Sequence, residues 1–251
     1  MTLRLEKEGR TAHLLIDRAA KRNAFDMAMW QALPQLLGQA AADPELRLLV
    51  LRAAAPGAFC AGADIAELLA NKDDAAWRAA NQAAINAAQF ELTRFALPTI
   101  AFVDGDCVGG GCGLALACDL RVASPRARFG ITPAKLGLVY PLHDVKLLTD
   151  LVGPGQARRM LYTGSLIDAD EALRIGLIEA LGADVAEFAG PILAASPHST
   201  REIKRFVRRV LGGQAEDDAE TLAVFAEAFT GPDFLEGTSA FTQKRKPEFR
   251  R

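Results

Sequence analysis

An α/β layered fold, in which helices cover a mostly parallel sheet, is the fold class that this 251-residue sequence predicts. Short apolar runs typical of buried strands alternate with longer helical patterns over residues 11–123. Helical patterns dominate from residue 153 onward. Hydrophobic residues make up 50% of the chain and charged residues 24%, as in globular proteins. Because about 75% of the unfolded surface can be buried at this length, we expect one large domain or a main domain with an appendage.

A strand, a helix and a second strand are expected first. Residues 11–17 (TAHLLID) have the apolar composition of a buried strand. Asp26 is placed to cap a helix that extends to about residue 42, and Pro34 should kink that helix or remove one hydrogen bond. Residues 46–53 (LRLLVLRA) predict the second strand.

The same alternation then repeats. After a loop of small residues at 56–64, residues 71–74 open a polar, alanine-rich helix that extends to about residue 95. Pro98 ends it. Three further apolar elements are expected: a strand at 99–104, a short buried helix at 114–118 and a strand at 120–123.

The last third of the chain is predicted to be helical. Asp168 and Glu171 have the spacing of a capping box, and Gly176 is a stop signal for that helix. Residues 203–211 place basic side chains at one-turn spacing beside an apolar stripe, which is typical of a solvated face next to a packing face. The basic and aromatic end, 241–251, is either a fraying tail or a docked arm.

Charge and cysteine usage argue against several classes of function. The net charge is −2, so the chain has no long-range attraction for nucleic acid or anionic lipid. No segment approaches the ~18 apolar residues of a membrane helix, and we expect a cytoplasmic protein. The four cysteines form no CxxC pair and the three histidines lie far apart, so neither a metal site nor a disulfide framework is expected.

The glycine-rich segment 105–113 matches no familiar nucleotide or nucleophile motif. Leu114 stands where a dinucleotide fingerprint and a nucleophile elbow centred on Cys112 both need glycine, and no GK[ST] follows. Glycines before a helix leave backbone N–H groups exposed and let a ligand approach the chain closely. Together with the loop at 59–64, such groups can stabilise a thioester carbonyl as it becomes an enolate. Taken alone, each loop favours the simpler interpretation, a tight turn where helix meets sheet.

The chain resembles the enoyl-CoA hydratase/isomerase (crotonase) superfamily over almost its whole length. The segments that carry the resemblance are IDRAAKRNAFD (16–26), DPELRLLVLR (43–52), AFCAGADIAEL (58–68), LPTIAFVDGDCVGGGCGLALACDLRVAS (97–124), FGITPAKLGL (129–138), LVGPGQARRMLYTGSLIDADEALRIGLI (151–178) and EGTSAFTQKRKPEF (236–249). The resemblance implies a ClpP-like spiral of repeated β-β-α units over residues 1–190 and a helical trimerisation region over 191–251. It also implies a homotrimer, or a hexamer built of two trimers.

The resemblance further implies an acyl-CoA substrate in fatty acid metabolism. No separate cofactor is expected, because coenzyme A is part of the substrate. The oxyanion hole would consist of the N–H groups of Ala63 and Gly110. The residues that match positions bordering CoA, the last two often in a neighbouring subunit, are Lys21, Arg22, Ala61, Asp64, Ile65, Phe241 and Lys244.

The sequence departs from the hydratases of the family at two catalytic positions. Hydratases carry one glutamate directly after the GGGC segment and a second after the FGxP segment, where this chain has Gly113 and Pro133. Hydration needs a group that activates water and one that protonates the α-carbon, so we expect poor hydration of crotonyl-CoA. Segment 138–145 (LVYPLHDV) replaces a glycine-rich loop and offers three candidate catalytic side chains: Tyr140, His143 and Asp144.

Three functions remain open at this point. The leading one is a lyase or isomerase that acts on an acyl-CoA through an oxyanion-stabilised enolate without the glutamate pair. Segment 129–142 is similar to the methylmalonyl-CoA decarboxylase branch, in which Tyr140 matches an active-site tyrosine, and decarboxylation needs no initial base. A non-catalytic acyl-CoA-binding protein is the third. His143 is either a surface residue or catalytic, and Asp144 is either a helix N-cap or an acid/base.

Overall fold

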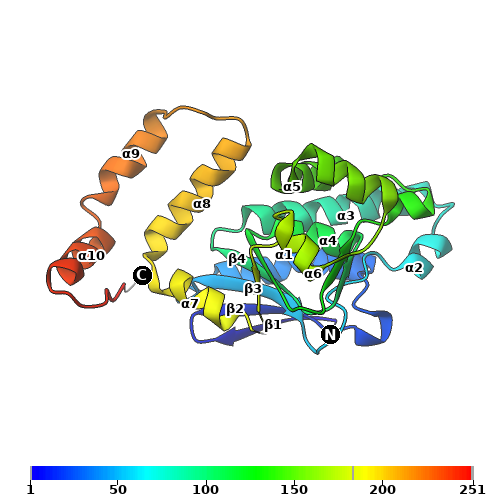
Figure 1. The fold of residues 1–251 in the computed structure, drawn as a ribbon, viewed down its shortest axis with the longest axis horizontal. Helices are drawn as coiled ribbons and strands as arrows, with labels where there is room; N and C mark the ends of the chain where they lie inside the picture. The colour runs from blue at the N-terminus through cyan, green and yellow to red at the C-terminus, as the bar shows by residue number, and fades with distance from the viewer. Residues whose placement is uncertain (1, 183, 250–251) are drawn as a thin grey trace.

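The computed structural model describes residues 2–182 and 184–249, and these form an α/β fold (Figure 1). Its main sheet has six strands in the order β1-β2-β3-β4-β6-β9. Only β1 and β2 are antiparallel, so the expected mostly parallel pairing is confirmed. The bounds are β1 (Leu3–Glu8), β2 (Thr11–Ile16), β3 (Leu48–Ala53), β4 (Thr99–Val103), β6 (Leu120–Ala123) and β9 (Ala180–Leu181).

A second, three-stranded sheet lies next to the main one. Its order is β5-β7-β8, with β5 and β7 parallel and β7 and β8 antiparallel. Its strands are β5 (Asp106–Val108), β7 (Arg128–Gly130) and β8 (Ile167–Asp168). Because β5 leads directly into the glycines at 109–111, this small sheet fixes where α4 begins.

The helices follow the predicted alternation in the first half and fill the last third. Asp26 caps the first helix through a hydrogen bond from Met29 N to its Oδ1 (2.9 Å), and Pro34 lies inside that helix without ending it. The helices are α1 (Met27–Ala41), α2 (Ile65–Ala70), α3 (Ala75–Arg94), α4 (Gly110–Ala117), α5 (Leu142–Thr163), α6 (Ala169–Arg174), α7 (Ala186–Ala194), α8 (Pro197–Leu211), α9 (Ala219–Ala228) and α10 (Pro232–Thr242), with short 3-10 turns η1 (Ala19–Lys21) and η2 (Pro133–Leu136).

One predicted helix start was wrong, and one predicted capping box forms only in part. Helix α4 begins at Gly110, four residues before the expected start at 114, because tertiary packing outweighs the low helix propensity of its glycines. Asp168 does cap α6, accepting a hydrogen bond from Glu171 N (2.8 Å), but the reciprocal half of the capping box does not form. The Glu171 carboxylate instead pairs with Arg159 and Arg174.

Helices pack against both faces of the main sheet. On one face, α1, α3, α4 and α5 enclose the larger core, in which Trp30, Phe25 and Phe59 are fully buried. On the other face, Val185 and Ala189 at the start of α7 pack on apolar residues of β3, β4 and β6. Within the described residues, no helix is both long and apolar enough to cross a membrane.

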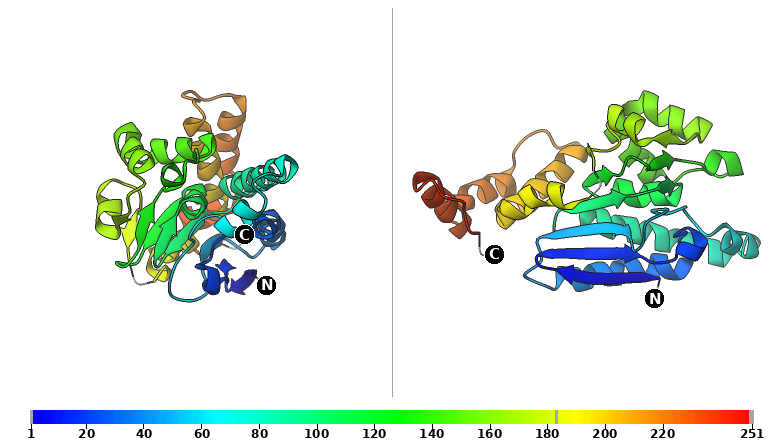
Figure 2. Two further views of the ribbon diagram at one scale, coloured as in Figure 1. Left: turned by 90° about the vertical axis from the view of Figure 1, so that its right-hand side faces the viewer. Right: turned by 60° about the horizontal axis from the view of Figure 1, so that its bottom comes forward.

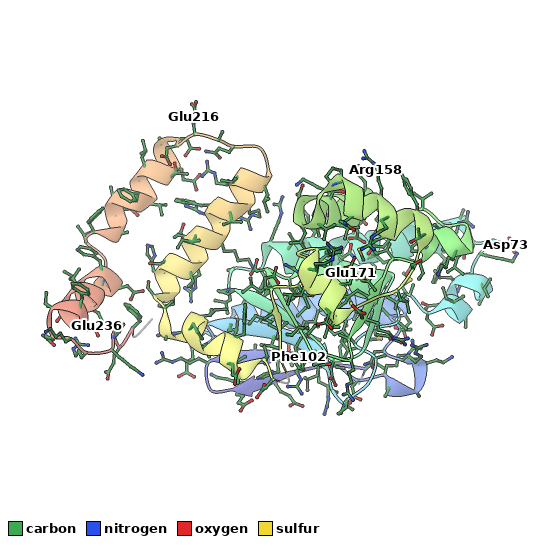
Figure 3. The ribbon with its side chains drawn as sticks, in the orientation of Figure 1. Asp73, Phe102, Arg158, Glu171, Glu216 and Glu236 are labelled. Atoms are coloured by element: carbon green, nitrogen blue, oxygen red, sulfur yellow. The ribbon has the colours of Figure 1, made fainter. Side chains whose placement is uncertain are left out.

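Helices α8 to α10 form an arm that projects from the side of the core (Figures 1 and 2). Figure 3 shows Glu216 at the turn between α8 and α9 and Glu236 on α10, the helix of the arm that lies farthest from the core. The arm is attached through Lys204, whose Nζ lies 2.7 Å from Asp119 Oδ2 and donates to Leu97 O at 2.8 Å. Beyond α10, the carbonyl of Phe249 accepts hydrogen bonds from Arg47 and Arg10. The described end of the chain is therefore docked and not frayed.

Candidate active site

Two loops meet edge to edge beneath the glycine-rich helix α4. Cys60 N donates to Asp106 O (3.1 Å) and Val108 N donates to Cys60 O (2.9 Å), which pairs the turn at 60–64 with β5. Gly111 is required at this junction, since a Cβ there would collide with the Cys60 carbonyl. The sequence analysis expected the two loops to act together on one ligand, and the structure brings their backbones into contact.

The backbones of Ala63 and Gly110 lie close together at this junction. A Cβ on Gly110 would lie 3.6 Å from Ala63 N, and one on Gly62, whose φ is +97°, would lie 3.2 Å from Gly110 N. Two backbone hydrogen bonds to Phe25 fix the turn at 60–64: Phe25 N donates to Gly62 O and Asp64 N donates to Phe25 O, both at 2.8 Å. Within the described residues, neither Ala63 N nor Gly110 N donates to a protein acceptor.

Both residues line one cavity of about 610 Å³. Helices α2 and α3 form one wall, and the segment from η2 to the start of α5 forms the other. Most of the lining is apolar. Its side chains include Trp30, Ile65, Leu68, Leu69, Trp77, Ile85, Pro133, Leu136, Leu138 and Val139. The buried polar side chains in the lining are Asn81, Gln89 and Asp144.

Asp144 is not a helix N-cap, which corrects one of the two interpretations of its sequence position. Helix α5 begins at Leu142 with Pro141 at the N-cap, and Asp144 lies in its first turn, 1% exposed. Its Oδ2 accepts a hydrogen bond from Gln89 Nε2 (3.2 Å), and His143 Nδ1 lies 3.3 Å from its Oδ1. Burial raises the pKa of the Asp144 carboxyl, although these two partners oppose the change.

The Asp144 carboxyl fills the space toward which a side chain at position 113 would point. A Cβ built on Gly113 would collide with Gln89 Nε2 and lie 2.8 Å from Asp144 Oδ2. The Asp144 carboxyl, which comes from α5, therefore occupies the space into which a side chain at position 113 would extend. The sequence analysis missed Gln89, because nothing in its helical neighbourhood distinguishes it from other polar residues of α3.

Tyr140 is buried in the wall of the cavity, but its hydroxyl is already hydrogen bonded. It donates to Gly109 O at 3.0 Å, and burial raises the pKa of the phenol well above its usual value, so the group stays protonated. The Gly109 carbonyl and the Gly110 N–H belong to the same planar peptide. Tyr140 therefore restrains the orientation of the Gly110 N–H.

His143 lies behind Asp144 and does not line the cavity. Its side chain is 37% exposed, so it connects the buried carboxyl with solvent. Of the three candidates from segment 138–145, the structure thus brings Tyr140 and Asp144 to the cavity and leaves His143 outside it.

The residues matched to CoA-bordering positions form two separate groups. Ala61 N donates to Arg22 O (3.0 Å), which joins the loop containing Lys21 to the turn before α2. Asp64 caps α2 through Ala66 N (3.0 Å) and pairs with Arg18 (2.9 Å), so its carboxylate is occupied. The second group, Phe241 and Lys244, lies at the end of α10 on the arm, far from the cavity of the same chain (Figure 1).

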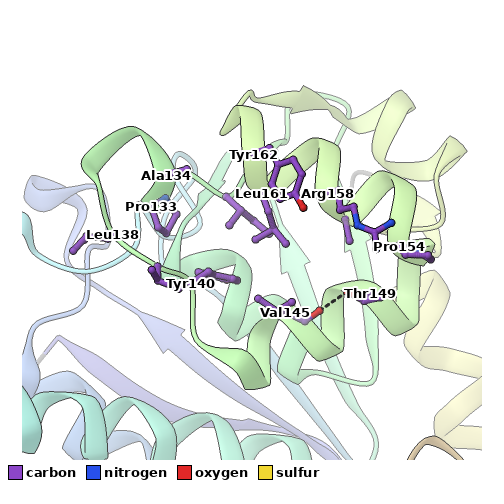
Figure 4. Close-up of a pocket in the computed structure, with 13 residues that line it drawn as sticks. Pro133, Ala134, Leu138, Tyr140, Val145, Thr149, Pro154, Arg158, Leu161 and Tyr162 are labelled. Carbon is purple, nitrogen blue, oxygen red and sulfur yellow. Dashed lines mark hydrogen bonds between the residues drawn. The ribbon is translucent and has the colours of Figure 1, made fainter.

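A second cavity, of about 480 Å³, lies on the other side of segment 138–141 (Figure 4). It occupies the bend of α5, where Gly153 has φ 72° and ψ 163° and Pro154 follows. Figure 4 shows Val145 and Thr149 from before the bend and Arg158 and Tyr162 from after it. The side chains shared by the two cavities are Pro133, Leu138, Val139 and Tyr140.

Comparisons with known proteins agree on one family. Residues 6–251 match the family model described as enoyl-CoA hydratase/isomerase. The chain is 34% identical to a crotonyl-CoA hydratase of Syntrophomonas wolfei, over 98% of this chain and 96% of that protein. It is 33% identical to a short-chain-enoyl-CoA hydratase of Clostridium acetobutylicum, over 97% of this chain and 95% of that protein. An enoyl-CoA hydratase/isomerase family protein from Hyphomonas neptunium has a similar structure, with a TM-score of 0.95 and 37% sequence identity. The match covers 100% of this chain and 98% of that one.

Proposed function

The chain belongs to the enoyl-CoA hydratase/isomerase family and has its α/β fold, and on that premise we propose that it hydrates an enoyl-CoA through a thioester enolate. Asp144 is the single carboxylate that carries the protons. The observation that carries this proposal is the position of the Asp144 carboxyl, in the space beyond Gly113 and in the cavity that Ala63 and Gly110 also line.

Ala63 N–H and Gly110 N–H form the proposed oxyanion hole. Two donors from the backbones of adjoining loops are held rigidly, so they need no reorganisation when negative charge develops on the thioester oxygen. Tyr140 acts on the second donor as a positioning residue through its hydrogen bond to Gly109 O.

Asp144 performs both proton steps in turn. Its carboxylate and the unpartnered Oε1 of Gln89 are two acceptors for one water molecule. The water oxygen bonds to the β-carbon while Asp144 takes one water proton, and the displaced electrons move to the thioester oxygen. Asp144 then returns that proton to the α-carbon, and the enolate collapses to the hydroxyacyl thioester. A raised pKa helps the carboxyl hold the proton between the two steps.

One carboxylate makes a slower hydratase than two. A positioned acid or base contributes about 10² to 10⁴ in rate, so turnover below that of a two-glutamate hydratase is expected. The relatives named above are hydratases, which favours hydration over isomerisation. The decarboxylase alternative is weaker, because the Tyr140 hydroxyl that would orient a leaving carboxylate is bonded to Gly109 O.

Coenzyme A is proposed to lie along Lys21, Arg22 and the turn at 61–65, by the family resemblance. Phe241 and Lys244 would reach it from a neighbouring copy, since both lie on the projecting arm. The arm exposes a row of apolar side chains that suits packing against other copies in a trimer or a hexamer. They are Leu222, Phe225, Phe229, Phe234, Leu235 and Phe241.

Asp144→Asn tests the proposal, with Asp150→Asn as the matched control. Asp150 lies on the same helix and pairs with Lys146, and it does not line the cavity. We expect Asp144→Asn to lower hydration of crotonyl-CoA and longer enoyl-CoAs at least a hundredfold with nearly unchanged affinity for the thioester, and Asp150→Asn to match wild type.

The same assays separate the other functions. CO₂ release from methylmalonyl-CoA without hydration would establish the decarboxylase. Tight binding of CoA thioesters without any turnover would establish a binding protein. Wild-type hydration by Asp144→Asn would remove Asp144 from the mechanism.

A further inference from the structure

The wall formed by α3 extends well past the proposed reacting atoms. Trp77, Asn81, Ile85 and Gln89 follow one another at four-residue spacing on the face that lines the cavity. The twelve helical steps from Trp77 to Gln89 span roughly 18 Å at 1.5 Å per residue. Gln89 lies at the end of this wall nearest the proposed reacting atoms, because it donates a hydrogen bond to Asp144. The cavity is therefore long enough for more than a four-carbon acyl group.

Asn81 interrupts this wall with a buried amide whose oxygen has no hydrogen-bond partner among the described residues. It is 6% exposed, and its Oδ1 accepts no hydrogen bond from any group in the part of the chain that the structure describes. Its neighbours along the wall are the apolar Trp77 and Ile85. Buried side-chain polar groups in native proteins are nearly always hydrogen bonded, and an unpaired one lowers stability. The proposed hydration does not use Asn81, so its polarity needs a separate explanation.

We propose that Asn81 is a specificity-determining residue that selects acyl chains carrying a hydroxyl group. This inference rests on the proposed function, in which the cavity holds the acyl chain. Asn81 lies eight residues from Gln89, about 12 Å along the helix, so the hydroxyl belongs well beyond the reacting carbons of a medium-chain acyl group.

A hydroxyl is the polar group that fits this position. It donates its proton to Oδ1, and its oxygen can accept from Nδ2. A carboxylate has no proton for Oδ1 and would place a second acceptor against it, which leaves the amide oxygen unsatisfied. An alkyl chain would leave the amide unpaired.

The test measures binding of saturated thioesters, which need no turnover. Octanoyl-CoA is compared by titration calorimetry with the four hydroxyoctanoyl-CoAs that carry the hydroxyl at carbon 5, 6, 7 or 8. We expect one hydroxylated thioester to bind the wild-type protein about tenfold more tightly than octanoyl-CoA. Asn81→Leu should abolish this preference and bind octanoyl-CoA more tightly.

A control and a stability measurement separate selectivity from a structural role. Asn86 is exposed on the same helix, where its Oδ1 accepts from Gln82, so Asn86→Leu should leave the affinity ratio unchanged. Asn81→Leu should melt at the same temperature as wild type or higher, because it removes an unpaired buried amide. A lower melting temperature with an unchanged affinity ratio would show that Asn81 is structural and overturn the proposal.

The remaining outcomes distinguish this inference from the proposed function. Equal affinity of the wild-type protein for octanoyl-CoA and all four hydroxylated thioesters would overturn the assignment of Asn81 and leave the proposed hydration standing. Absence of binding by every thioester would overturn both.

Discussion

Replacing Tyr140 with phenylalanine removes one hydroxyl and leaves the ring in place, so it isolates the restraint on the Gly109–Gly110 peptide. The lost hydrogen bond is 3.0 Å long and buried. Gly109 O also accepts from Gly113 N at 3.2 Å, so the carbonyl keeps a partner when the hydroxyl is gone. The free energy of unfolding should therefore fall by only about 0.5–1.5 kcal/mol, the usual net contribution of one hydrogen bond.

The effect on turnover should be larger than the effect on stability. Losing an oxyanion donor altogether lowers kcat by about 10² to 10³, which is the upper bound here because the Gly110 N–H remains. We expect kcat for an enoyl-CoA to fall at least tenfold while KM stays nearly constant, since the ring still fills its part of the wall.

Tyr162 is the matched control, because it is the only other tyrosine and its side chain is exposed. Tyr162→Phe should match wild type in kcat, KM and the urea midpoint of unfolding. Wild-type kcat in a folded Tyr140→Phe variant would refute the view that this hydroxyl orients a catalytic donor. An equal loss of kcat in both variants would refute it as well.

Three further predictions concern the same site. Gly110→Pro removes a donor N–H and should lower kcat by about 10² to 10³ in a variant whose circular dichroism matches wild type; unchanged kcat would exclude Gly110 from catalysis. Gly113→Ala places a methyl group against Gln89 and Asp144 and should lower both the melting temperature and kcat, whereas wild-type values for both would show that the Gln89–Asp144 pair moves freely. Because the pKa of Asp144 is raised on folding, the folded protein holds more protons than the unfolded chain, and stability falls as pH rises from about 4 through the folded pKa. Asp144→Asn should flatten that slope in urea unfolding measured across this range, and parallel slopes would contradict the raised pKa.

The sequence predicted the elements whose signals are local. Strands β2, β3 and β4 are predominantly apolar and largely buried, and Asp26 caps α1 as expected. Strand β1 was missed because its sequence, LRLEKE, alternates apolar and charged residues at the edge of the sheet. The two-residue strands β8 and β9 are too short to show any periodicity.

The candidate site was predictable where backbone geometry demands a residue type. Glycines at 110, 111 and 113 and the small residues at 60–64 mark the close approach of two loops, and the structure brings Ala63 and Gly110, which the resemblance paired, close together. The side-chain partners were not predictable. Gln89 and Asp144 lie 55 residues apart and meet only because α3 and α5 pack on either side of α4. The free amide of Asn81 likewise depends on what surrounds it in space.

A carboxyl side chain at position 113 would need the space that the Asp144 carboxyl occupies, so Gly113 and Asp144 are linked features of the site. Both carboxyl positions compete for the same space, so the chain can hold a side chain beyond Cα at 113 or the Gln89–Asp144 pair, but not both without movement. The proposed proton carrier therefore lies on α5, whereas the two N–H donors lie at the start of α4 (Gly110) and in the turn before α2 (Ala63). Because segment 138–144 also supplies Tyr140 and separates the two cavities, a change there alters proton transfer, donor orientation and cavity shape together. A change at Asn81 affects the α3 wall alone, and for that reason acyl selectivity and catalysis can be altered separately.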